Sequence, residues 1–289
     1  AMSDTKATAS ALSNCSITAQ VSTKPNRSHL VTGRTALILP CLGRSEKDHT
    51  SVGEQFVSVE NSMGIVHSSR GSSKPASGML RSEPSIVSGI AGALDTRIGR
   101  SGIAWQDLAE DYDKVRDMIE ASIPGFEGYN ERVRLDGGFY LPNPPRDSRT
   151  FPTESGYANF RVHDLSGASA GPGRYLMMTI RSHDQYNTTI YGLDDRYRGI
   201  NKGRRVVLMN QSDMDDNDWS KGDLVDLTSH FEGTELHARE WYIVPYEIPK
   251  GNIATYFPEA NVLVPLDSVA EGSNTPTSKS VVVTIRATD

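Results

Sequence analysis

The feature that most constrains the fold is a close succession of short strand candidates in the C-terminal part of the sequence. Each is a run rich in apolar and β-branched residues, and turn residues such as Gly222-Asp223 and Lys250-Gly251 lie between the runs. The runs are residues 174–180, 205–209, 224–228, 237–244 and 280–285. Strands of this length and spacing are typical of closed β architectures, so we predict a mainly antiparallel barrel.

The N-terminal part has a different pattern, in which short apolar runs alternate with helical stretches. Residues 12–21 end in strand-like alternation, and a second run, residues 36–39, stops at Pro40. We expect a helix over residues 86–94 capped by Ser85, and apolar residues at helical spacing from Trp105 to Ile119. Residues 46–80 indicate extended loop with one short hairpin. The pattern predicts an α/β layer with a parallel sheet.

Proline, glycine and serine are concentrated between residues 140 and 173. Such a composition is typical of a crossover between domains. We therefore predict two domains, an α/β part with its linker over residues 1–150 and a barrel over residues 151–289.

Charge and cysteine content exclude several classes of protein. The formal net charge of −6 disfavours a partner held by phosphate neutralisation, so no nucleic acid is expected. The basic segment 194–205 is an exception, either solvated loop or anion contact. All apolar runs are far shorter than the roughly 18 residues that span a bilayer. The two cysteines, Cys15 and Cys41, are too few and too far apart for a disulfide framework or a zinc motif. Because both are expected to be reduced and no export signal is visible, we predict a cytoplasmic protein.

One segment combines many hydrogen-bonding side chains directly after a strand candidate. It holds Arg181, Ser182, His183, Asp184, Gln185, Tyr186, Asn187 and Thr188. Guanidinium and hydroxyl donors suit phosphate oxygens, and a carboxylate suits the N–H edge of guanine. From the residues alone, a ligand-binding loop and a polar turn are equally good interpretations.

A second candidate is the segment YFPEANVLVP at residues 256–265. The amide of Asn261 can donate and accept on one edge of a pterin or purine. Alternatively, Tyr256 and Phe257 belong to the core and Asn261 caps a turn. Motifs for zinc hydrolases, α/β-hydrolases, P-loop proteins and Rossmann dehydrogenases are absent from the sequence.

The order of these segments resembles the C-terminal region of bis-molybdopterin-guanine-dinucleotide oxidoreductases, and most closely the formate-dehydrogenase-like alpha-subunit family. Four passages carry the resemblance: QVSTKPNRSHLVTGRTALILPCLGRSEKD at 20–48, LMMTIRSHDQYNTTIYG at 176–192, KGDLVDLTS at 221–229 and GNIATYFPEANVLVP at 251–265. SKSVVVTIR at 278–286 adds to them. The resemblance implies the end of a Rossmann-like α/β cofactor domain, followed by a double-psi β-barrel that binds the molybdopterin dinucleotide.

The resemblance also implies which residues contact the cofactor, molybdopterin guanine dinucleotide with molybdenum. Arg181, Ser182, His183, Asp184, Tyr186, Asn187 and Thr188 would contact the dinucleotide. Asn261 and Lys279 would approach a pterin. Ser22, Thr23 and Asn26 would contact the nucleotide from a strand end of the α/β part.

The sequence departs from that family because it lacks the parts that carry the chemistry. Two isolated cysteines cannot ligate a four-iron cluster, so a 4Fe–4S cluster and the molybdenum ligand are expected in a missing N-terminal part of the same polypeptide. The full protein would also use an electron-transfer partner. Two alternatives stay open. One is a free-standing cofactor- or nucleotide-binding protein, and the other is a barrel enzyme of the aspartate-decarboxylase-like fold, which Gly71-Ser72 and Gly272-Ser273 support poorly.

Overall fold

The computed structural model describes residues 2–99, 101–164, 169–186 and 192–288. The chain forms two compact units, one made of Ala1–Cys15 and Asp164–Asp289 and the other of Ser16–His163. The first residues thus group with the barrel and not with the rest of the predicted 1–150 segment. One contact that holds them there is a hydrogen bond of 2.8 Å from the Asp4 N–H to the Val264 carbonyl.

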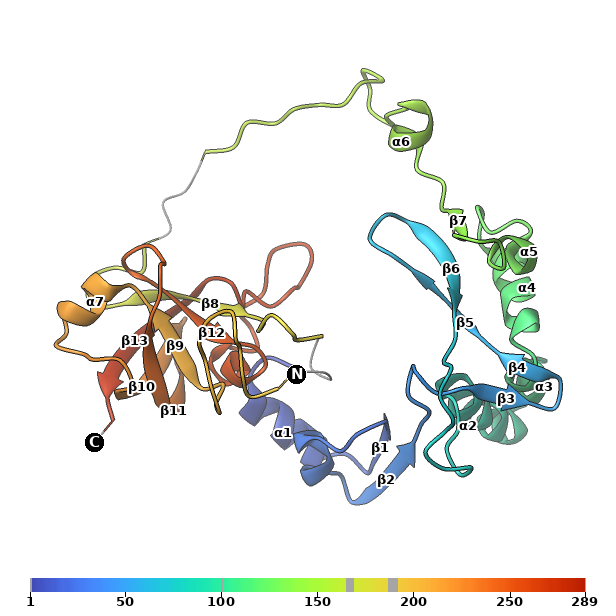
Figure 1. Ribbon diagram of the computed structural model, residues 1–289, viewed down its shortest axis with the longest axis horizontal. Helices are drawn as coiled ribbons and strands as arrows, with labels where there is room; N and C mark the ends of the chain where they lie inside the picture. Colours follow the sequence, from blue (N-terminus) through green and yellow to red (C-terminus); the bar gives the residue numbers. More distant parts are fainter. Residues whose placement is uncertain (1, 100, 165–168, 187–191, 289) are drawn as a thin grey trace. The chain divides into compact units, whose positions relative to one another are not determined.

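Six strands of the first unit form a closed barrel (Figure 1). They are β8 (Tyr175–Ile180), β9 (Val206–Met209), β10 (Leu224–Phe231), β11 (Thr234–Pro245), β12 (Asn252–Tyr256) and β13 (Val281–Ala287). Around the ring the order is β10-β11-β9-β12-β8-β13. The pairs β8–β12 and β9–β11 are parallel, and the other four are antiparallel. The predicted fold class, an α/β segment followed by a β-barrel, is confirmed.

The barrel interior is filled by alternate residues of these strands. In β8, Tyr175, Met177 and Thr179 are buried while the residues between them are not, as expected when one face of a strand lies in a core. All four residues of β9 are buried. The described residues of this unit also form three short helices: α1 (Thr5–Ser13), α7 (Gln211–Asp215) and the 3₁₀ helix η2 (Glu259–Leu263).

The second unit contains three small sheets and five α-helices among its described residues. The parallel pair is β1 (Ile17–Ser22) and β2 (Thr35–Pro40), with the 3₁₀ helix η1 (Arg27–Leu30) between them. Two antiparallel sheets are β3 (Asp48–Thr50) with β4 (Gly53–Gln55), and β5 (Val57–Glu60) with β6 (Ile65–Ser69) and β7 (Phe139–Tyr140). The helices are α2 (Glu83–Ile98), α3 (Trp105–Glu110), α4 (Tyr112–Ser122), α5 (Tyr129–Arg132) and α6 (Pro144–Ser148).

Several predicted elements differ in detail from the structure. The strand candidate at residues 12–21 begins inside α1, and residues 46–80 contain two hairpins in place of one. Helix α2 begins earlier than predicted because Ser82 caps it by accepting from the Ser85 N–H. The stripe from Trp105 to Ile119 is divided between α3 and α4, because Asp111 ends the first helix and caps the second. In the part of the chain that the structure describes, no helix is long and apolar enough to cross a membrane.

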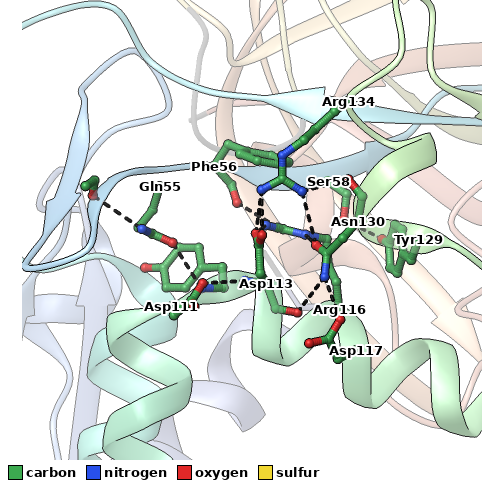
Figure 2. Close-up of polar contacts among 12 residues, drawn as sticks. Gln55, Phe56, Ser58, Asp111, Asp113, Arg116, Asp117, Tyr129, Asn130 and Arg134 are labelled. Atoms are coloured by element: carbon green, nitrogen blue, oxygen red, sulfur yellow. Dashed lines mark hydrogen bonds and ion pairs between the residues drawn. The ribbon is translucent and has the colours of Figure 1, made fainter.

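A buried arginine joins the helices of the second unit to its strands (Figure 2). Arg116 of α4 is 3% exposed and donates from Nη1 to the Phe56 carbonyl at 3.1 Å and from Nε to Asn130 Oδ1 at 2.6 Å. The third guanidinium nitrogen, Nη2, donates to the carboxylate of Asp113. The same carboxylate accepts two hydrogen bonds of 2.7 Å from Arg134. Burial alone would raise the pKa of the Asp113 carboxyl, but Arg134 and Arg116 together hold it below its usual value.

The replacement Asp113→Asn should lower the melting temperature at neutral pH and have less effect in acid. Because the folded-state pKa of Asp113 is depressed, its contribution is complete above the unfolded value of about 3.9 and is lost as the pH falls through the folded-state pKa. The melting-temperature difference from wild type, measured between pH 7 and pH 3, should therefore shrink below about pH 4. Asp136→Asn is the control, and a constant difference for Asp113→Asn would contradict this account.

Candidate functional site

The candidate site lies on the barrel rim where two parallel strands end together. Ile180 at the end of β8 is the register partner of Tyr256 at the end of β12, and the Phe257 N–H donates to the Ile180 carbonyl at 2.8 Å. The two loops that follow carry Arg181 on one side and Asn261 on the other. Because parallel strands end at the same edge, both predicted segments leave the barrel from one rim.

A buried guanidinium ties these two loops together. Arg204 is 4% exposed and donates from Nη1 to Ser182 Oγ at 2.8 Å, and from Nη2 to Gln185 Oε1 and the Phe257 carbonyl, both at 2.8 Å. Its Nε donates to Glu259 Oε1 at 2.9 Å. Ser182 and Gln185 are buried as well, so both side chains hold the loop in shape from inside.

A second buried charge, Asp195, holds the next part of the rim. Its carboxylate accepts from the Tyr256 hydroxyl at 2.8 Å and from Arg198 Nη1 at 2.7 Å. His183 Nδ1 lies 3.3 Å from the same carboxylate, and the His183 ring packs on Tyr197 with centroids 4.3 Å apart. Burial would raise the pKa of Asp195, but the hydrogen bond from Tyr256 and the charge of Arg198 keep it below its usual value.

Sequence reasoning missed Arg204, Asp195 and Arg198 as components of the rim, and it included Gln185 in the polar segment without its role as an acceptor for Arg204. The basic segment 194–205 looked like solvated loop or anion contact, yet two of its arginines point into the protein. Arg204 and Arg205 both precede the apolar run 206–209, and the sequence does not distinguish the buried Arg204 from the exposed Arg205. Arg196 is the opposite case, since it is exposed and lies 3.9 Å from Asp184.

Two cationic side chains lie close together on this rim. The backbone N–H of Thr179 donates to the Ser278 carbonyl at 2.9 Å, and the Lys279 ammonium donates back to the Thr179 carbonyl. Burial and then the nearby charge of Arg181 lower the pKa of Lys279. Lys279 donates to the residue two positions before Arg181, so both positive charges belong to the end of β8 and suit a phosphate there. This part of the rim fits an anionic ligand.

The other predicted site residues have different surroundings. Asp184 and Tyr186 are exposed, whereas Asn261 is 5% exposed within η2. Asn187 and Thr188 lie outside the described residues. Ser22, Thr23 and Asn26 belong to the second unit. There Asn26 caps η1 by accepting from the Ser28 N–H at 2.9 Å, and Ser22 donates to the Lys24 carbonyl at 2.5 Å.

The second unit also contains a cavity of about 370 Å³ that the sequence did not predict. Its wall includes Arg44, Asp48, Ser82 and Tyr112. The Tyr112 hydroxyl lies 2.5 Å from both Asp48 Oδ2 and Ser82 Oγ, so these polar groups are paired with one another. Among the described residues, no group of three or more His, Cys, Asp and Glu side chains could hold a metal ion.

Comparison with known families finds a match for the barrel. Residues 175–282, from the start of β8 into β13, match the family described as "Molydopterin dinucleotide binding domain". The barrel matches a molybdopterin dinucleotide-binding domain. The matched family is described by its binding of a molybdopterin dinucleotide, and the cations on the barrel rim suit the phosphates of a dinucleotide.

Longer proteins resemble nearly the whole chain. The chain is 50% identical over 291 residues to "Uncharacterized oxidoreductase Rv2900c" of Mycobacterium tuberculosis, covering 99% of this chain and 37% of that protein. It is 43% identical over 291 residues to "Protein YdeP" of Escherichia coli K12, covering 98% of this chain and 38% of that protein. The chain thus spans well under half the length of these relatives.

A solved structure shares the fold. Acetylene hydratase from Pelobacter acetylenicus superposes with a TM-score of 0.51 over 87% of this chain and 38% of the hydratase chain, at 11% sequence identity. At that identity the likeness concerns the fold alone.

The replacement Arg204→Gln should destabilise the barrel strongly. Removing one partner of a buried ion pair leaves the other partner without compensation, which costs roughly 3–5 kcal/mol, and here the Ser182 and Gln185 acceptors are also left incomplete. Urea unfolding followed by tryptophan fluorescence measures the loss. Arg196→Gln, an exposed arginine of the same segment, should change stability by no more than about 0.5 kcal/mol. Equal effects of the two replacements would contradict the role given to Arg204.

Proposed function

We propose that this chain is the molybdopterin guanine dinucleotide-binding C-terminal region of a molybdenum-dependent oxidoreductase of the formate-dehydrogenase-like type. The match of residues 175–282 to the dinucleotide-binding family carries the proposal. The printed name of the mycobacterial relative, an oxidoreductase, supports the reaction class. The greater length of the relatives favours a part of a larger enzyme over a free-standing binding protein.

The proposed roles of the rim residues follow from their charge and exposure. Arg181 and Lys279 bind the phosphates, because they are neighbouring cations. His183, Asp184 and Tyr186 offer ring faces and a carboxylate to the purine. Ser182, which Arg204 holds from inside, positions the loop.

The remaining assignments rest on the family resemblance. Asn261 approaches the pterin from the turn after β12. Asn187 and Thr188 extend the dinucleotide contacts, and Ser22, Thr23 and Asn26 contact the nucleotide from the second unit. Bound to this scaffold, the cofactor supplies electron transfer through molybdenum.

We also propose the properties of the intact protein. It is a cytoplasmic enzyme whose preceding part holds a 4Fe–4S cluster and supplies the molybdenum ligand. It delivers or receives electrons through a separate partner. In this arrangement the present chain binds and orients the cofactor and performs no redox step alone.

The replacement Arg181→Ala in the full-length protein should reduce cofactor retention. A hydrogen bond to a charged group contributes about 1.5–3 kcal/mol, so retention should weaken roughly 10- to 100-fold. Molybdenum content by mass spectrometry and guanine nucleotide released on denaturation provide two readouts. Asn261→Ala should weaken retention less, but because Asn261 is buried it should also lower the melting temperature.

Lys250→Ala is the matched control for Arg181→Ala. Lys250 is an exposed cation just before β12, at the strand end opposite the proposed site, and its partner is Asp216. This variant should retain its full cofactor content. Normal cofactor content together with a large fall in melting temperature for Arg181→Ala would show that Arg181 serves the fold and not the ligand.

The isolated 289-residue chain should show no formate dehydrogenase activity or other redox turnover. The sequence has neither a cluster of cysteines nor a motif for the molybdenum ligand. Dye reduction with formate, compared with a metal-free sample, tests this expectation. Turnover above that background would refute it.

A further inference from the structure

Helix α2 exposes its apolar side. Val87, Ile90, Leu94 and Ile98 are 59%, 46%, 52% and 54% exposed. Consecutive members of this set are three or four residues apart, so they form one stripe along the helix. A surface helix normally turns such a stripe toward a core.

Another side of α2 carries small residues, and part of it packs against α3. Ser88 is buried. A Cβ added at Gly92 would lie 3.6 Å from the Trp105 Cβ, which shows how closely α3 approaches. Helix α2 is thus packed in its own unit through its small side, and its apolar stripe has the character of an interface.

The parallel pair β1–β2 also exposes large apolar side chains. It is a sheet of two strands, and Ile17, Leu37 and Ile38 on it are 55%, 42% and 56% exposed. Parallel sheets are normally covered on both faces, and two strands alone are marginally stable. The pair has the properties expected of a fragment of a larger sheet.

The described strands of this chain do not supply the missing partners. All six strands of the barrel are closed into a ring, so the barrel has no free edge to offer. The other described strands of the second unit pair in antiparallel sheets of their own. The relatives, however, contain far more polypeptide than this chain covers.

We propose that the β1–β2 pair and the α2 stripe form a docking surface for the remainder of the same polypeptide. That remainder adds strands to the open edges of the pair and buries Val87, Ile90, Leu94 and Ile98. The inference rests on the proposed function in one respect, namely that the chain is part of a longer enzyme. It goes further by naming the residues through which the two parts join.

Site-specific photo-crosslinking in the full-length protein tests the proposal. A benzophenone amino acid replaces Ile38 or Leu94, and mass spectrometry identifies the captured peptide. Both positions should capture peptides from outside residues 1–289. Thr96 is the control, because it is exposed, lies outside the apolar stripe and donates its hydroxyl within α2 to the Gly92 carbonyl. A benzophenone amino acid at this position should capture no peptide from outside residues 1–289.

Other captures would overturn the proposal. Capture of residues 164–289 would mean that the barrel unit covers the surface, and a cross-linked species of twice the mass would mean a second copy. No capture at either position would mean that the surface is uncovered, as would a full-length product of only 289 residues. Where the bulky replacement prevents folding, Leu94→Cys and Thr96→Cys give the same comparison through maleimide labelling, and slow labelling of Leu94→Cys alone supports docking.

Molybdenum content of the same samples separates this proposal from the proposed function. Capture of the remainder by a protein that never binds molybdenum would leave the docking surface intact and refute the cofactor assignment. A protein that contains molybdenum but shows no capture would support the cofactor assignment and refute the docking surface.

Discussion

A buried guanidinium is stable only when its donors meet acceptors, and this requirement organises the barrel rim. Arg204 satisfies it with Ser182, Gln185, Glu259 and the Phe257 carbonyl, which belong to loops from different strands. Few arrangements of those loops provide four acceptors at once. The loop that follows β8 and the turn that follows β12 are therefore held against each other without a ligand. The backbone positions of the exposed side chains on both loops are fixed by the same contacts.

The second unit uses the same device with different residues. Arg116 is buried beside Phe56, its guanidinium carbon 4.1 Å from the ring centroid, and it meets acceptors from α4, α5 and the strand region (Figure 2). Arg134 shares Asp113 with it. In both units a paired internal charge joins segments that lie apart in the sequence.

Sequence patterns located elements that local composition determines, such as most barrel strands. They missed contacts between residues that lie far apart in the sequence. Five barrel strands were found because their runs are apolar, whereas β12, NIATY, has too few large apolar residues to stand out. Helix α1 was missed because Thr, Ala and Ser dominate it. The rim segment beginning at Arg181 was found from its composition, but the pairing of Arg204 with Glu259 arises only on folding. The spacing of the strand candidates predicted the barrel, the family resemblance supplied its expected ligand, and the contacts to a cofactor remain predictions.

The attachment of α1 to the barrel makes the second unit an insertion. The Asp4 N–H donates to the Val264 carbonyl, so the barrel unit is assembled from residues before and after the second unit. Closing so long a loop costs entropy that grows only slowly with its length, yet it imposes an order in time. Within this chain Asp4 is made long before Val264, so the hydrogen bond between them can form only after the whole second unit has been synthesised.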